Sequence, residues 1–254
     1  MLIRPVHSVP DLAEVHSMVR STQLGVLTTG IASSSYPFLQ STHIPWVLDV
    51  DPSGLKEDGT PDLGTLRGHI ARQNPQSKAM VEAVKEGGPE EEGELQDEVL
   101  VLFTLPNHAY VAPHWWTETK PKTQKVVPTW NYEAVQVYGR LTVRHGGEPA
   151  DAFLSQQIRD LSHQGESSIG HTGPGEWKVE DAPAPYINQL KRVIVGLEIK
   201  ITRIEGKSKM SQEERLPDRI GIAAGFEAQG TEVSKALAEK VRQRSDEKEA
   251  AKAA

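Results

Sequence analysis

The stretch VPTWNYEAVQVYGRLTVR, residues 127–144, decides the fold class of this 254-residue chain. From Val135 to Val143 every second residue is apolar or glycine, which is the period of a half-buried β-strand. The preceding run Thr129, Trp130, Asn131, Tyr132 is different. It places four hydrogen-bonding side chains, two of them large aromatics, directly after Pro128. The start of an ordinary strand does not require such side chains. The segment therefore predicts a strand and raises the question of what its first residues hold.

Further strand-like segments lie on both sides of this one and are separated by turn-rich sequence. They cover residues 24–29, 38–49, 66–72, 98–105, 108–113, 131–144 and 193–206. Few long helices lie between them, which argues against a parallel sheet built from strand–helix–strand units. The pattern favours an antiparallel barrel or sandwich.

Three helices are predicted near residues 11–20, 75–86 and 149–164. The second begins at Asn74-Pro75, a good capping residue followed by proline at the first helical position. The acidic run 87–98 is poor in core residues and is expected to form a mobile loop. Residues 1–225 are expected to form one domain. The charged tail 226–254 is expected to be a solvated helix that frays into disorder.

Composition excludes several classes of chemistry. The chain has no cysteine, which removes disulfides, thiolate-bound metals, iron–sulfur clusters and thiol catalysis. The net charge of −7 argues against a dominant basic surface for nucleic acid. With no apolar leader and no 18-residue apolar run, the expected protein is soluble and cytoplasmic and has no membrane partner.

The segment LRGHIARQNPQSK, residues 66–78, is a candidate phosphate site. It runs from a strand into the capped helix start at Asn74, with Arg72 just before and Lys78 on the helix. Free backbone N–H groups at a helix start favour anions. The spacing fits a simpler interpretation at least as well, in which Arg72 and Lys78 are surface charges and His69 is a core histidine.

Aromatic residues gather in NHAYVAPHWW, residues 107–116. His108, Tyr110, Trp115 and Trp116 form either a core or interface cluster or the wall of a ligand site. A polar, lysine-rich loop follows, which is a poor place to bury two indoles unless another surface covers them. No histidine spacing typical of a metal site and no serine-nucleophile motif is present, so no metal site is expected and catalytic residues are not identified.

Five motifs in order resemble the PaiB-like family of FMN-binding split-barrel proteins, often labelled negative transcriptional regulators. They are THIP (42–45), GHIARQNPQ (68–76), HAYVAPHWW (108–116), VPTWNYEAVQVYG (127–139) and VGLEIKITRIEGKSKMSQ (195–212). The resemblance runs from about residue 1 to 225. The segment SQEERLPDR, residues 211–219, departs from the family pattern, which puts a role for that loop in doubt.

The resemblance implies a mainly β fold, a six-stranded antiparallel split β-barrel with peripheral helices, assembled as a homodimer that holds FMN at its interface. It implies Arg72, Asn74 and Lys78 for the phosphate, with Thr42 and His69 beside them. Thr129, Trp130, Asn131 and Tyr132 would then form the pocket wall. His108, Tyr110, Trp115 and Trp116 would lie against the ring or the substrate.

Three functions follow from the resemblance. The first is a flavoprotein for redox chemistry or flavin sensing, in which the cofactor reacts and the protein orients it. The second is a haem protein with His69, His108 or His114 as axial ligand. The third is a transcriptional regulator, although the chain shows no evident DNA-binding motif and direct nucleic-acid contact is not expected. A visible spectrum separates flavin bands from a Soret band.

Overall fold

The structure is a computed structural model that describes residues 1–85 and 92–253. The chain divides into two compact units. Unit 1 comprises Met1–Thr22, Thr104–Val135 and Glu205–Ala254, and unit 2 comprises Gln23–Phe103 and Gln136–Ile204. Two long strands, β9 (Thr129–Arg144) and β10 (Ile194–Lys209), contribute residues to both units.

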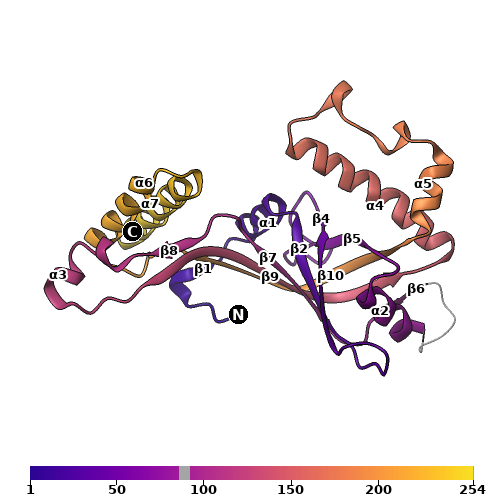
Figure 1. Ribbon diagram of the computed structural model, residues 1–254, viewed down its shortest axis with the longest axis horizontal. Coiled ribbons are helices and arrows are strands. Elements are labelled where there is room, and N and C mark those ends of the chain that lie inside the picture. The colour runs from indigo at the N-terminus through magenta and orange to yellow at the C-terminus, as the bar shows by residue number, and fades with distance from the viewer. Residues whose placement is uncertain (86–91, 254) are drawn as a thin grey trace. The chain divides into compact units, whose positions relative to one another are not determined.

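The strands form a sheet with the order β3-β2-β7-β9-β10-β5-β4 (Figure 1). The remaining strands of this path are β2 (Leu24–Gly30), β3 (Leu39–Pro45), β4 (Val47–Asp49), β5 (Thr65–Ala71) and β7 (Val99–Thr104). Pairs β2–β3, β2–β7, β4–β5 and β5–β10 are antiparallel. Strand β3 stands at one end of this strand order, yet it contacts β5, which lies near the opposite end. The sheet of unit 2 therefore curls back on itself. This confirms the mainly antiparallel split barrel.

The predicted number of six strands is too low. The described residues form ten, because three short strands join the edges of the long ones. These are β1 (Ser8–Val9) on β10, and β6 (Glu92–Glu94) and β8 (Ala109–Val111) on β9. The predicted strand 38–49 is also broken at Trp46, whose backbone N–H donates to the carbonyl of Gln23 instead (2.9 Å).

Alternation along β9 builds the core of unit 2. Val137, Leu141 and Val143 are fully buried, whereas Tyr138, Arg140 and Thr142, which alternate with them, are half-buried. Position 139 holds glycine instead of an apolar side chain, because a Cβ there would lie only 2.4 Å from the carbonyl oxygen of Lys200 on β10. Close approach of two backbones is a recognised use of strand glycine.

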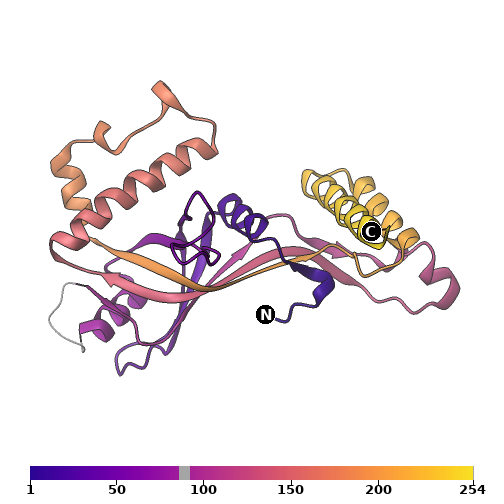
Figure 2. The same ribbon diagram turned by 180° about the vertical axis from the view of Figure 1, so that it is seen from behind.

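Helices α2 (Pro75–Lys85), α4 (Gly147–Ser168) and α5 (Ala184–Lys191) belong to unit 2, with the short 3-10 turns η3 (Gly173–Gly175) and η4 (Val179–Asp181). The first two confirm predicted helices, and Figure 2 shows α4 and α5 from behind. Asn74 caps α2, since its Oδ1 accepts from the backbone N–H of Gln76 at 2.9 Å.

Unit 1 contains η1 (Pro5–His7), α1 (Leu12–Ser21), η2 (Pro113–Trp115), α3 (Thr119–Thr123), α6 (Leu216–Gln229) and α7 (Glu232–Ala253). Helix α1 is the predicted first helix, capped by Asp11. Helices α6 and α7 pack side by side (Figures 1 and 2). Their shared core consists of Val111, Trp115, Trp116, Met210, Ile222, Ala223, Phe226, Leu237, Ala238 and Val241.

Two expectations about charged segments need correction. Residues 92–98 are not all loop, because Glu92–Glu94 form β6 on β9 and Leu95 is buried. Ion pairs of Glu92 with Arg144 and Glu94 with Arg140 accompany this pairing. Residues 87–91 of the same run lie outside the described part.

The tail is helical, as predicted, but it is not merely solvated. Leu237, Ala238 and Val241 on α7 are almost completely buried, and the predicted boundary at residue 225 falls inside α6. In the described part of the chain, no helix has both the length and the apolar character needed to cross a bilayer.

Candidate functional site

The corner between β5 and α2 brings two predicted site residues together in unit 2. The side-chain amide of Asn74 donates to Thr42 Oγ1 on β3 at 3.1 Å, while its Oδ1 caps α2. Gln76, the next buried residue, donates from Nε2 to Thr29 Oγ1 and to the carbonyls of Leu27 and Gln40 at 3.0–3.3 Å. The start of α2 is therefore held rigidly against β2 and β3.

This corner retains polar groups that the described residues do not satisfy. The Ser77 hydroxyl is completely buried at the first turn of α2 and has no hydrogen-bond partner in the described chain. Lys78 is exposed and forms no ion pair with any residue that the structure describes. Buried polar groups are nearly always satisfied, and a helix start favours anions, so the corner fits an anionic group such as a phosphate.

Arg72, although only two residues from Asn74, contacts different elements. Its Nε donates to the carbonyl of Arg192 (3.1 Å), and its Nη2 donates to the carbonyls of His145 (2.8 Å) and Ile194 (3.1 Å). The structure thus ties Arg72 to the ends of β9 and β10, and it does not join Arg72 with Asn74 in one hydrogen-bonded group. Arg72 lines a cavity of about 390 Å³.

His69 on β5 is half-buried and has a partner within the same unit. Its Nδ1 lies 2.7 Å from Oε1 of Gln157, a completely buried residue of α4. This contact joins β5 to α4. His108 and His114, the other two histidines considered as ligands, are exposed in unit 1.

The second set of predicted residues lies at the start of β9 in unit 1. Alternation along the strand leaves Trp130 53% exposed and buries Asn131 completely. Oδ1 of Asn131 accepts a hydrogen bond from the Ser211 hydroxyl at 3.0 Å, whereas its Nδ2 has no partner among the described residues. Ser211 adopts a left-handed backbone conformation with φ of 59°. An unpaired amide donor thus lies directly after an exposed indole.

Two lysines that the sequence analysis did not assign lie beside these residues. Nζ of Lys209 donates to Thr129 Oγ1 at 2.6 Å and to the carbonyl of Trp130 at 2.9 Å. Burial lowers the pKa of Lys209, with Glu213 opposing this shift. Nζ of Lys207 lies 5.0 Å from the ring centre of Tyr132. Alternation of lysine with Ser208 in GKSKMS is the signal that places both lysines on one face of a strand.

The aromatic residues predicted as a ring wall separate into two groups. Tyr110 is 46% exposed, and its ring lies 6.4 Å from that of Trp130 in a T-shaped arrangement. The ring of His108 lies 6.1 Å from Trp130. Trp115 and Trp116 are instead buried in the core with α6 and α7, and the ring of Trp115 packs 4.9 Å from that of Phe226. The chain's own C-terminal helices are the surface that covers these two indoles.

Comparison with known proteins identifies a matching family and several relatives. Residues 1–203 match the model of the family described as "Putative FMN-binding domain". An uncharacterised protein of Aspergillus fumigatus is 48% identical, with 98% of this chain and 99% of that protein covered. The protease synthase and sporulation protein PAI 2 of Bacillus subtilis is 26% identical, over 94% and 95% of the two chains.

Among solved structures, the flavocytochrome Anf3 from Azotobacter vinelandii superposes with a TM-score of 0.45 at 14% identity, covering 80% of this chain and 69% of that one.

Proposed function

Since residues 1–203 match its model, the chain belongs to the FMN-binding family, and we propose that it binds FMN and uses it in redox chemistry. FMN is the cofactor that the family assignment supports. Flavin-dependent redox catalysis, in preference to flavin sensing, is the more specific part of the proposal.

The observation that carries the proposal is the start of β9. An isoalloxazine ring is flat and has hydrogen-bonding groups along one edge, so it needs an aromatic surface and polar groups beside it. Trp130 and Tyr110 supply exposed aromatic faces in contact with each other. The ammonium of Lys209 supplies donors next to them. The unpaired amide of Asn131 lies on the opposite, buried face of the same strand. Stacking of a heteroaromatic ring on such a side chain contributes about 1–3 kcal/mol.

For the phosphate, we propose the corner at the start of α2. Asn74 orients this helix start against Thr42, Ser77 has an unused hydroxyl, and Lys78 carries an unpaired positive charge on the first turn, as far as the described residues show. This set lies in unit 2, whereas the ring set lies in unit 1.

In this proposal the side chains bind and orient, and none is assigned as nucleophile or acid. FMN, when bound, supplies the capacity to accept and donate a hydride. Trp130 provides the surface that orients the ring, and Lys209 donates to its backbone carbonyl. Lys209 brings a positive charge into a partly buried position, where charge interactions are stronger than in water.

Titrations of FMN and riboflavin, which differ only in the phosphate, test both sets. Replacing Trp130 with alanine is expected to weaken both ligands by about 1–3 kcal/mol, because the stacking surface is lost. Replacing Lys78 with alanine is expected to weaken FMN alone, by up to about 1.5–3 kcal/mol for a charge-assisted contact. Trp177→Ala, which removes an exposed tryptophan of unit 2 outside both sets, is the matched control and should change neither affinity.

Absence of measurable FMN affinity in the wild type would rule out the proposal as a whole. Equal losses for FMN and riboflavin in Lys78→Ala would instead show that the phosphate is held elsewhere. Redox catalysis is tested by anaerobic mixing of the FMN-loaded protein with NADH or NADPH while the flavin absorbance is followed. Bleaching faster than that of free FMN supports catalysis, and an unchanged rate supports sensing.

A further inference from the structure

The cavity that Arg72 lines belongs to neither of the two sets proposed for FMN. It has a volume of about 390 Å³ and is lined by the segment after β9, the start of α4 and the C-terminal end of α5, which leads into β10. Its ionisable lining residues are Arg72, His145, Asp151, Lys191 and Arg192, all in unit 2. We propose that this cavity is a second anion site, which binds the phosphate group of a small phosphate monoester.

Arg72 supplies a positive charge to this cavity. Its guanidinium is half-buried and bonds only to three neutral backbone carbonyls, at 2.8–3.1 Å. In the part of the chain that the structure describes, no carboxylate pairs with it. A partly buried charge is costly unless an opposite charge compensates it. The arginine is also held in place before any ligand arrives, which reduces the entropy lost on binding.

Among the other lining residues, Arg192 adds a second positive charge to that of Arg72. Lys191 is paired with Asp151 at 2.7 Å and also donates to Ser155 Oγ at 2.9 Å, so these two charges compensate each other. The side chain of Arg192 is exposed and forms no ion pair within residues 1–85 and 92–253. Arg72 and Arg192 therefore leave an excess of two positive charges at one cavity. Both arginines can donate to phosphate: Nη1 of Arg72 keeps two N–H donors beyond its bonds to the carbonyls, and the exposed guanidinium of Arg192 can contact two oxygens at once.

The size and walls of the cavity indicate the rest of the ligand. Its volume corresponds to roughly a dozen water molecules in the liquid, more than a free phosphate requires. Gly146 and Gly147 form one wall without side chains, so a ligand can approach the backbone there. Ala150 and Leu154, both buried, offer an apolar surface. A phosphate attached to a compact organic group fits this combination of walls.

The test uses the full-length protein, with and without saturating FMN, at low ionic strength. Calorimetric titrations with inorganic phosphate, glycerol 3-phosphate and glycerol are compared. Both phosphates should bind, the ester more tightly because of the apolar wall, and glycerol should not. Arg192→Ala should weaken both phosphates on the order of tenfold, as expected for loss of one charge-assisted contact. Lys200→Ala, which removes an exposed charge from β10 outside the cavity, is the matched control.

Arg72→Ala should weaken phosphate at least as much, and its melting temperature shows whether the fold is retained. Absence of phosphate binding in the wild type, or unchanged affinity in Arg192→Ala, would overturn the proposal. A selective loss of FMN over riboflavin in Arg192→Ala would also overturn it, because the cavity would then be the phosphate site of FMN itself. Phosphate binding by a protein without FMN affinity would support this inference while refuting the proposed function.

Discussion

Gly225 on α6 shows how one residue can permit a packing arrangement. A Cβ at this position would lie 2.3–2.5 Å from ring atoms of Trp115, so the indole packs directly on the helix backbone. Alanine there would displace either the ring or the helix. We expect Gly225→Ala to lower the free energy of unfolding by about 1–3 kcal/mol, as overpacking of a filled core does. Urea unfolding followed by tryptophan fluorescence measures the change.

Gly165 on α4 is the matched control for this prediction. A Cβ there would meet no atom within 4 Å, and the residue lies inside a long helix. Alanine is favoured over glycine in helices by about 1 kcal/mol. Gly165→Ala should therefore leave stability unchanged or raise it. Equal effects of the two substitutions would mean that the contact of Gly225 with Trp115 does not determine the packing.

At the scale of elements, α7 contributes to the core of unit 1. Leu237 is completely buried against the cluster that contains Trp115 and Phe226. Leu237→Ala should lower the free energy of unfolding by about 2–5 kcal/mol, the range for large-to-small changes in a core. Val233→Ala, on the same helix but 40% exposed, should change it by less than about 0.5 kcal/mol. Equal, small losses in thermal or urea unfolding would mean that α7 does not cover the core.

The contact between α7 and α6 should depend on pH. Hydrogen bonds from Lys252 and Arg219 hold the pKa of Glu249 down to about 2. A lowered pKa in the folded state stabilises the protein above the ordinary value near 4.5, and the stabilisation is lost as pH falls toward 2. Glu249→Gln should thus be less stable than wild type at pH 7, and the difference should shrink between about pH 5 and pH 2.

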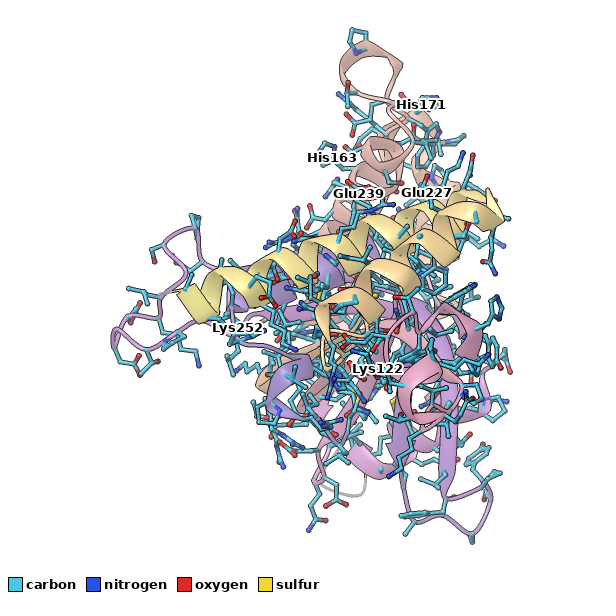
Figure 3. The ribbon with its side chains drawn as sticks, turned by 90° about the vertical axis from the view of Figure 1, so that its left-hand side faces the viewer. Lys122, His163, His171, Glu227, Glu239 and Lys252 are labelled. Carbon is cyan, nitrogen blue, oxygen red and sulfur yellow. The ribbon has the colours of Figure 1, made fainter. Side chains whose placement is uncertain are left out.

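Glu239→Gln is the control for this pH dependence. Figure 3 labels Glu239 and Lys252 on α7, and Glu239 is exposed. Its substitution should leave the stability profile unchanged. If the difference in free energy of unfolding between wild type and Glu249→Gln were as large at pH 2 as at pH 7, the Glu249 carboxylate would not be the group that causes the pH dependence.

At the scale of the whole molecule, we propose a homodimer. The family resemblance implies this assembly, but Trp115 and Trp116 do not contribute an exposed surface to it, because α6 and α7 cover them. Trp130 and Tyr110 remain about half exposed, and Val127 is 74% exposed. Large apolar side chains gathered at a surface indicate an interaction site. Sedimentation should show a dimer at micromolar concentration, and Tyr110→Glu should weaken it at least about tenfold by placing a charge in the interface.

Tyr186→Glu, which changes an equally exposed tyrosine in unit 2, should leave the dimer intact. A wild type that sediments as a monomer at these concentrations would refute the assembly. Equal dissociation by both tyrosine variants would show that the surface around Trp130 is not the interface.

Local patterns were sufficient to predict most of the elements. The alternation along β9 and the Asn74-Pro75 start of α2 depend on residues that are close in sequence. The structure confirms both of these elements, and it confirms helices α1 and α4. Helix α6 was not predicted, because LPDRIGIAAGFEAQ carries two glycines and a proline that weaken a helical pattern. The strand β6 was missed because its acidic sequence has no strand pattern, whereas in the structure it pairs with β9 and forms ion pairs with Arg140 and Arg144.

The sequence predicted which residues belong to the candidate site better than it predicted which of them contact one another. Thr42 and Asn74 were both proposed, and the structure joins them, but Arg72 contacts carbonyls up to 122 positions away in sequence. Residue types and their periodicity are local properties, so they predict a β fold before any contact is known, and the resemblance of the five ordered motifs indicates a family. Burial and the choice of hydrogen-bond partner depend on which distant segments meet. Only the tertiary structure could therefore place Trp115 under α6 and α7, and leave Trp130 open to a ligand.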